Sequence, residues 1–312
     1  MGREEVSKSN PAARIIDFGK SLNNRSATQA NIYRHPVILG LLVIIFVSLV
    51  AVISSTRLSG IDWQDTYRPA TLAMLQGRNP YALEVAPEAP FFAAPWGLLP
   101  LVPLALLPLE VGRAVLLLVS LISFAYTARR LGAGRIGVAA FTLSPPVMHC
   151  LLNANMEWMP LLGFILPPQI GLFLISVKPQ TGFAVGIFWL FAAWRKGGWR
   201  EVVYTFAPVT IALLLSFVLY GPWLFKVGGV LGIATNFNAS LWPLSIPIGL
   251  TLIVTAIRKK EIRFAMPASP CLSPYVLFHS WSSALVALAG HKMELITAVI
   301  GLWIVVILQL WG

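Results

Sequence analysis

Two carboxylates lie close together just beyond the first long apolar stretch of the chain. Asp62 and Asp65 belong to the segment Ile61-Asp-Trp-Gln-Asp-Thr-Tyr-Arg-Pro-Ala70, which follows apolar residues 36–56. A partly buried carboxylate at such a place can act as a general base, because desolvation raises its pKa toward the working pH. The alternative is that these acids only solvate a loop, and residue types alone leave both interpretations open.

Two further ionisable residues border apolar segments. Lys178 follows an apolar run and precedes Pro179, and Glu157 ends the segment Asn153-Ala-Asn-Met-Glu157. Ionisable residues at membrane depth suggest function. The alternatives are a lysine that reaches out to the membrane interface and an acid in water at a loop. No His, Cys, Asp or Glu cluster has convincing zinc spacing, and no Gly-rich loop of the phosphate-binding kind is present.

The composition requires a lipid environment. The chain is 57% hydrophobic and 11% charged, with a mean hydropathy of +0.77, whereas a soluble domain has roughly a quarter of its residues charged. The net charge of +11 comes from short basic clusters between apolar runs. This pattern is typical of cytoplasmic loops and not of a nucleic-acid surface. We therefore expect membrane lipids, and no nucleic acid, as partners.

The apolar runs predict an all-α polytopic membrane protein with about 8–10 transmembrane helices, since a spanning helix needs ~20 mostly apolar residues. Three other apolar stretches contain several prolines, which break or kink helices. The expected spans are 36–56, 111–129, 136–152, 179–194, 202–220, 241–257, 275–290 and 293–311, and the proline-broken stretches are 90–109, 156–177 and 264–274.

The basic clusters orient these spans. If all clusters are cytoplasmic, residues 1–35 form a cytoplasmic segment, and 36–312 form one transmembrane domain. Residues 57–110 are then an extracytoplasmic first loop with juxtamembrane helices. The clusters are Arg34 with the upstream tail, Arg129–Arg130–Arg135, Arg195–Lys196–Arg200 and Arg258–Lys259–Lys260–Arg263.

The same orientation places Glu157 and Lys178 on the outer side. The 20 residues between them are too few for two spans, and Pro167–Pro168 lies near their middle. A re-entrant hairpin of two half-helices over 156–177 fits this spacing, because broken helices are tolerated where they line a cavity. The alternative is a single kinked span, with one basic cluster on the outer side.

Several short elements follow one another along the chain: Asp62, Tyr67, Gly77-Arg-Asn-Pro-Tyr81, Phe91-Phe-Ala-Ala-Pro-Trp-Gly97, Asn153–Glu157, Lys178-Pro-Gln-Thr-Gly182 and Ser269-Pro-Cys-Leu-Ser-Pro-Tyr275. In this order they resemble the GT-C class of membrane glycosyltransferases, in particular the family-87 mannosyltransferase-like proteins. The chain departs from that family at Ala154, where the family has Gly, and at Glu157, where the acid is usually Asp. The spacing from Asp62 to Asn79 also differs, so Asp65 remains a rival for the family's Asp.

The resemblance implies a short member that transfers a sugar, such as mannose, from a polyprenyl-phosphate donor on the outer face of a prokaryotic cytoplasmic membrane. The N-terminus would be cytoplasmic, the reaction inverting, and the lipid-linked sugar a co-substrate with no other cofactor or metal. The implied roles are general base for Asp62 or Asp65, donor-phosphate binding for Lys178 and Gln180, and substrate binding for Tyr67, Asn79, Tyr81, Asn155, Glu157 and Tyr275.

Two other functions fit the same sequence. Broken helices that meet in a membrane are typical of transporter sites, so a transporter or lipid-handling protein is one alternative. The small size fits a non-catalytic subunit of a membrane complex, built on a transferase scaffold. An enzyme should bring Asp62 or Asp65, Glu157 and Lys178 together at one outer cavity.

Overall fold

The computed structural model describes residues 36–311, except 57–59, 83, 86–88 and 226–236. Every regular element in the described residues is a helix, and these residues contain no strand. The expectation of an all-α fold is confirmed for this part of the chain. The segment 1–35, expected to be cytoplasmic, lies outside the described residues.

The chain divides into two compact units, Met1–Ser55 and Thr56–Gly312. In the first unit, helix α2 covers Pro36–Ser55 and contains no charged residue. Its 20 residues correspond to ~30 Å, the thickness of a bilayer core. The helix matches the first expected span.

Four helices in the described residues are long and apolar enough to cross a membrane, and a bent pair could add a fifth. The bent pair, α6 and α7, meets at an angle of 57° where 136–152 was expected to be one span. Pro145 and Pro146 begin α7 and account for the break, since proline lacks the amide hydrogen that a helix interior needs. The long helices are α2, α5 (Leu109–Arg130), α10 (Pro179–Tyr220) and α15 (Lys292–Trp311), and the pair is α6 (Arg135–Thr142) with α7 (Pro145–Asn153).

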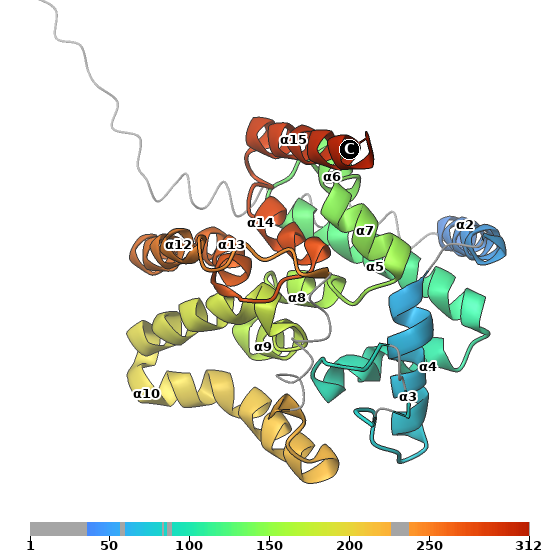
Figure 1. The fold of residues 1–312 in the computed structure, drawn as a ribbon, viewed down its shortest axis with the longest axis horizontal. Coiled ribbons are helices and arrows are strands. Elements are labelled where there is room, and N and C mark those ends of the chain that lie inside the picture. Colours follow the sequence, from blue (N-terminus) through green and yellow to red (C-terminus); the bar gives the residue numbers. More distant parts are fainter. Residues whose placement is uncertain (1–35, 57–59, 83, 86–88, 226–236, 312) are drawn as a thin grey trace, which may run out of the picture. The chain divides into compact units, whose positions relative to one another are not determined.

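Helix α10 is two helical arms joined at a pair of glycines. Gly197 and Gly198 have non-helical backbone angles, and φ of Gly198 is +62°, a conformation that glycine adopts without a steric cost. Figure 1 shows the arms folded back on each other into a V. The arms correspond to the expected spans 179–194 and 202–220, separated by the predicted basic turn.

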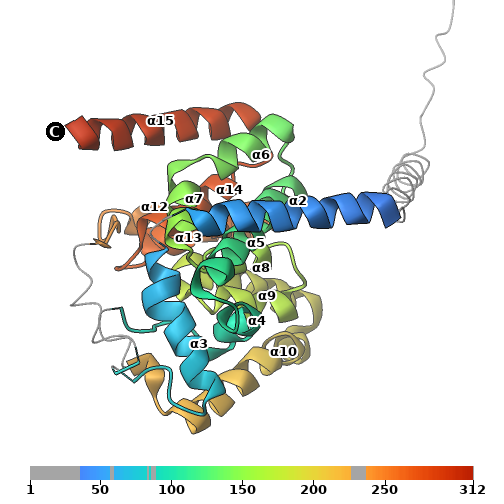
Figure 2. The same cartoon turned by 90° about the vertical axis from the view of Figure 1, so that its right-hand side faces the viewer.

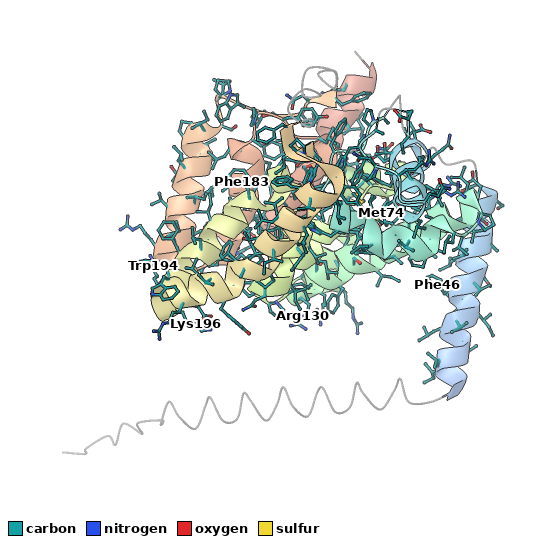
Figure 3. The ribbon with its side chains drawn as sticks, turned by 90° about the horizontal axis from the view of Figure 1, so that it is seen from below. Phe46, Met74, Arg130, Phe183, Trp194 and Lys196 are labelled. Atoms are coloured by element: carbon teal, nitrogen blue, oxygen red, sulfur yellow. The ribbon has the colours of Figure 1, made fainter. Side chains whose placement is uncertain are left out.

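The turns that carry basic clusters lie at one end of the second unit. The Arg195 guanidinium donates to the Ile257 carbonyl at 2.5 Å, and Arg263 contacts His291. Figure 3 shows Arg130 and Lys196 at the same edge of this unit, away from Met74. Helices α5 and α12 (Ile246–Lys259) therefore end in this region, and the glycine turn between the two arms of α10 also lies there.

One expectation near the C-terminus holds in part, and another is wrong. The stretch 264–274 was expected to be broken by prolines and not to be a full span. With 11 residues, α13 (Ile262–Leu272) is too short for a span, yet it is one helix with Pro267 and Pro270 inside it. It packs closely on α12, where a side chain at Gly249 would meet Leu272. This packing compensates for the backbone hydrogen bonds that the two prolines cannot donate.

The stretch 275–290 was expected to be a full span but is a loop with two short helices. These are η4 (Phe278–Trp281) and α14 (Ser282–Val286). Ser280, Ser282 and Ser283 are buried here, and the Ser283 hydroxyl donates to the Ser280 carbonyl. Such local bonds compete with helical hydrogen bonding. The expectation of a span rested on the apolar composition of the segment and did not take these serines into account. Likewise, the expected span 241–257 reduces to the 14-residue α12.

The proline-rich stretch 156–177 forms two short helices, α8 (Trp158–Gly163) and α9 (Pro168–Ile175), which meet at Pro167. The helices approach closely through glycines, because a Cβ on Gly171 would lie 2.6 Å from the Gly163 carbonyl and 2.4 Å from Trp189. Small residues give such close contacts between apolar helices. The hairpin packs against the first arm of α10.

The remaining elements lie in the residues after α2 and at the C-terminal end. The stretch 90–109 forms η2 (Pro95–Leu101) and α4 (Val102–Ala105), again proline-interrupted. Figure 2 shows α15 running along α6, and the Trp303 indole donates to the Leu143 carbonyl at 3.0 Å. The helices η1 (Asp62–Tyr67) and α3 (Arg68–Leu75) follow one another without a break.

Candidate functional site

The first acidic segment folds as a π-helix that directs Asp62 toward the hairpin. Trp63 is fully buried, and its indole donates to the Leu109 carbonyl at 3.1 Å. The Gly60 amide, in a left-handed turn, donates to the Leu152 carbonyl at 3.0 Å. These two bonds hold Asp62 at the end of α7. Short π-helical turns occur frequently at functional sites.

Asn155 joins Asp62 to the hairpin. Helix α7 ends at Ala154, which has a left-handed φ of +52°, and the chain then turns so that the Asn155 side chain faces Asp62. Its amide nitrogen donates to Asp62 Oδ2 at 2.5 Å, although the two residues are 93 positions apart in sequence. Its amide oxygen accepts a hydrogen bond from Lys178. The amide can serve both partners only in this orientation.

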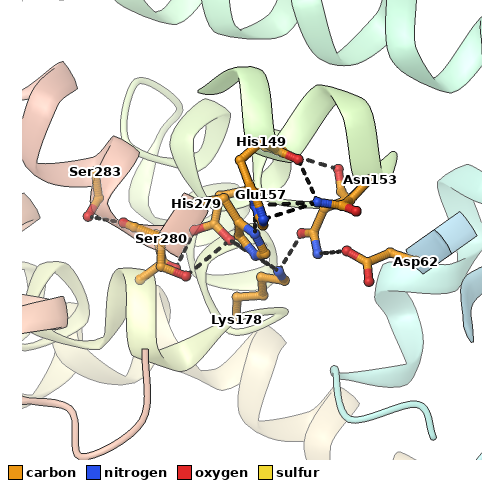
Figure 4. Close-up of polar contacts among 11 residues, drawn as sticks. Asp62, His149, Asn153, Glu157, Lys178, His279, Ser280 and Ser283 are labelled. Carbon is orange, nitrogen blue, oxygen red and sulfur yellow. Dashed lines mark hydrogen bonds and ion pairs between the residues drawn. The ribbon is translucent and has the colours of Figure 1, made fainter. Parts of the chain in front are cut away.

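Lys178 lies between α9 and α10, and its side chain is buried among three acceptors (Figure 4). The ammonium group contacts Asn155 Oδ1, Glu157 Oε2 at 3.1 Å and His279 Nε2 at 3.1 Å. An ammonium has three hydrogens, so these three partners satisfy it fully. A phosphate could contact Lys178 only by exchanging with one of them.

Glu157 is the counter-ion of Lys178 and is completely buried. It also accepts hydrogen bonds from the Thr181 hydroxyl and, at 3.4 Å, from the Ser280 hydroxyl. A buried carboxylate requires such compensation, because its desolvation is costly. We call the set Asp62, Asn155, Glu157, Lys178, Thr181, His279 and Ser280 the polar cluster.

His149 extends the polar cluster by stacking on His279. The rings of His279 and His149 are 5.6 Å apart and nearly parallel, and their Nδ1 atoms are separated by 3.4 Å. Burial and the neighbouring Lys178 charge hold the pKa of His279 well below its usual range. A neutral His279 can accept from Lys178 through Nε2, which places its own hydrogen on Nδ1, toward His149.

Burial raises the pKa of Asp62 above its ordinary value, against the opposing effects of the Asn155 hydrogen bond and the Lys178 charge. Asp62 is half-buried at the edge of the polar cluster. A carboxylate that remains accessible and binds protons more tightly than usual is a better general base than an ordinary carboxylate.

An apolar groove adjoins the polar cluster. It has a volume of about 600 Å³ and lies between α9, the two arms of α10 and residues 273–275. Tyr275 lines the groove, and its pKa is raised first by burial and then by the negative charge of Asp62. Gln180, two positions after Lys178, also lines the groove. Its walls include Phe183, Gly186, Phe206, Val209, Leu213 and Trp223.

The structure brings together four of the residues singled out from the sequence: Asp62, Asn155, Glu157 and Lys178. Gln180 and Tyr275 line the adjoining groove.

The other four singled-out residues lie outside the polar cluster. Asp65 is one turn farther along η1 and half-exposed, and Tyr67 is buried with its ring against Phe91. Asn79 and Tyr81 shape the first loop. The Asn79 side chain contacts the Tyr220 carbonyl and the Tyr81 amide, and the Tyr81 hydroxyl donates to the Ala93 carbonyl at 2.8 Å.

Sequence reasoning missed Thr181, His279 and Ser280. Thr181 falls in the first turn of α10, three positions after Lys178, and that spacing could have indicated a shared face. His279 and Ser280 come from a segment taken to be a span, where a histidine and several serines in apolar sequence were the available signal.

No group of three or more His, Cys, Asp or Glu side chains in the described part of the chain is arranged to hold a metal ion. No family model, no curated protein and no solved structure matches this chain.

Proposed function

We propose that the chain is a polytopic membrane protein of the GT-C type, and that it transfers a sugar from a polyprenyl-phosphate donor to an acceptor hydroxyl. The long apolar helices and the basic turns gathered at one end support the membrane setting. The basic end would face the cytoplasm of a prokaryotic cell. The polar cluster would then lie in the outer half, with the α8–α9 hairpin re-entrant from the outer face.

One observation carries the proposal: an accessible carboxylate with a raised pKa belongs to the polar cluster, which adjoins an apolar groove of about 600 Å³. The substrate of such a site should have an apolar chain next to a centre that reacts with base assistance. A sugar linked to a polyprenyl phosphate has both features. The fixed Asn155 contact aims Asp62, and such positioning is a large part of catalytic power.

In the proposed reaction, Asp62 takes the proton of the acceptor hydroxyl. The hydroxyl oxygen forms a bond to the anomeric carbon, and the carbon–oxygen bond to the phosphate breaks, with inversion. The polyprenyl phosphate leaves with the electron pair. A cation would stabilise this leaving group, and Lys178 could supply one if the phosphate exchanged with His279 or Asn155.

Sugar transfer in reconstituted vesicles tests the proposal. Wild type, Asp62→Asn and Asp65→Asn would each be given radiolabelled polyprenyl-phosphate mannose and other polyprenyl-phosphate sugars. We expect transfer by wild type, a loss of roughly 10²–10⁴-fold in Asp62→Asn and near-normal transfer in Asp65→Asn. Equal transfer by wild type and Asp62→Asn would refute the assignment of the base.

A lipid-binding protein without catalysis is the second candidate. The observation that favours it is that Lys178 already has three partners, one of them the carboxylate of Glu157. In the same vesicles this function predicts saturable binding of the donor without transfer, and equal affinity in wild type and Asp62→Asn.

A further inference from the structure

Basic side chains gather at the turns on one end of the second unit, away from the polar cluster. Three contacts join these turns: Arg195 with the Ile257 carbonyl, Arg263 with His291, and the backbone at Gly132 with that at Gly290. The cationic end, as we name it, consists of Arg129, Arg130, Arg135, Arg195, Lys196, Arg200, Arg258, Lys259, Lys260, Arg263 and Lys292.

Most of this positive charge is uncompensated. Lys196 pairs with Glu201, and Arg263 pairs with Glu261, each at 2.6 Å. The other basic side chains of the cationic end have no acidic partner among the described residues. Like charges held this close raise the local potential and favour anion binding.

The charge is densest where the first arm of α10 meets the end of α12. Arg258 and Lys259 occupy the last turn of α12, and Lys260 follows in a left-handed conformation. All three side chains are exposed. The Arg195 bond to the Ile257 carbonyl fixes the neighbouring turn of α10 beside them.

Exposed tryptophans lie between this charged region and the apolar surface of the two arms of α10. Trp194 and Trp199 lie on either side of the glycine turn and are 60% and 63% exposed. Farther along the two arms, Phe191 and Val203 are also exposed. A progression from apolar side chains through tryptophan to Lys and Arg is the pattern that proteins present to a membrane interface. A free phosphate would contact only the basic side chains and would not require the exposed tryptophans or the exposed apolar side chains.

We propose that the cationic end binds anionic phospholipids, with Arg195, Arg258, Lys259 and Lys260 contacting headgroup phosphates. Trp194 and Trp199 lie at the level of the glycerol and upper acyl chain. The inference rests on the membrane setting of the proposed function and not on its chemistry. Lipid binding is measured without any sugar donor, so failure of transfer and failure of this site give different results.

Native mass spectrometry of the full chain in detergent tests the site with phosphatidylglycerol and phosphatidylcholine as competing probes. We expect preferential retention of phosphatidylglycerol. A basic residue near an anionic surface contributes about 1 kcal/mol, so Arg258→Gln should weaken binding about fivefold. The triple change Arg258→Gln, Lys259→Gln and Lys260→Gln should weaken it on the order of 100-fold.

Arg78→Gln is the matched control. Arg78 is an exposed arginine in the first loop, whose neighbour Asn79 contacts Tyr220 at the far end of α10, and its loss should leave phosphatidylglycerol binding unchanged. The double variant Lys259→Arg/Lys260→Arg keeps the charges and should bind like wild type, which separates charge from folding. Equal retention of the two lipids, or equal weakening by Arg78→Gln and Arg258→Gln, would overturn the proposal. Competition by glycerol phosphate as strong as by phosphatidylglycerol would overturn the lipid as its source.

Discussion

Replacing Lys178 by Met should destabilise the protein strongly. Lys178 is 6% exposed, and its ammonium group lies 3.1 Å from Glu157, which is completely buried. Methionine of similar length leaves that carboxylate with only the Thr181 and Ser280 hydroxyls as donors. Asn155 Oδ1 and His279 Nε2 also lose their donor.

The expected cost follows from these losses. Removal of one partner of a buried ion pair costs about 3–5 kcal/mol, because the remaining charge is desolvated and unpaired. For a domain of this size, that corresponds to a fall in Tm on the order of 10 °C. The double variant Lys178→Met/Glu157→Gln removes both charges and should lose less stability than the two single changes together.

Two natural reporters suit this measurement. Cys150 and Cys271 are buried free cysteines, so a thiol-reactive fluorophore detects unfolding of the protein in detergent. Lys196→Met is the control, because its ion pair with Glu201 is at the surface, and its Tm should not change measurably. A Tm for Lys178→Met equal to that of the wild type, or fully additive losses in the double variant, would refute the reasoning.

Three further outcomes are expected. Gly171→Ala should lower stability by about 1–3 kcal/mol, because the new Cβ would meet Trp189 and the Gly163 carbonyl, whereas Gly186→Ala makes only ordinary contacts; equal thermal unfolding of the two would contradict this. Transfer should fall as pH drops through the raised pKa of Asp62, since the base must be ionised, and Asn155→Ala should move this limb of the pH–rate profile to higher pH because it removes a bond that lowers that pKa; an unmoved limb would argue against it. Val209→Trp should fill the groove and raise KM for the lipid donor without moving the pH profile, and an unchanged KM would exclude the groove as its site.

The sequence predicted those helices that are marked by the composition of their own residues. Apolar length predicted α2, α5 and α15, and the basic turn around Gly197–Gly198 separated the two arms of α10. Proline positions predicted the break at Pro167 but not the break at Pro145. The span expected over 136–152 includes Pro145 and Pro146, and the structure divides it there. Apolarity alone did not reveal the turn at His279, because its polar side chains are buried and satisfied internally.

The candidate site was predictable up to the point where distant segments meet. Charge counting predicted one side for Asp62, Glu157 and Lys178, and the structure brings these residues into one network through Asn155. The contribution of His279, 101 positions from Lys178, depends on how η4 packs against α7. No residue pattern near Lys178 encodes that packing. The full engagement of Lys178 by its neighbours was likewise visible only in three dimensions.

The decisive measurement for Asp62 as general base is the release of polyprenyl phosphate in a single turnover. Purified wild type and Asp62→Asn, each shown to be folded by the thiol assay, would be mixed with a polyprenyl-phosphate sugar and an acceptor. We expect release coupled to an inverted glycoside in wild type, and a rate roughly 10²–10⁴-fold lower in Asp62→Asn. Release at the same rate in both proteins would exclude Asp62 as the base, and a product with retained configuration would exclude the inverting reaction.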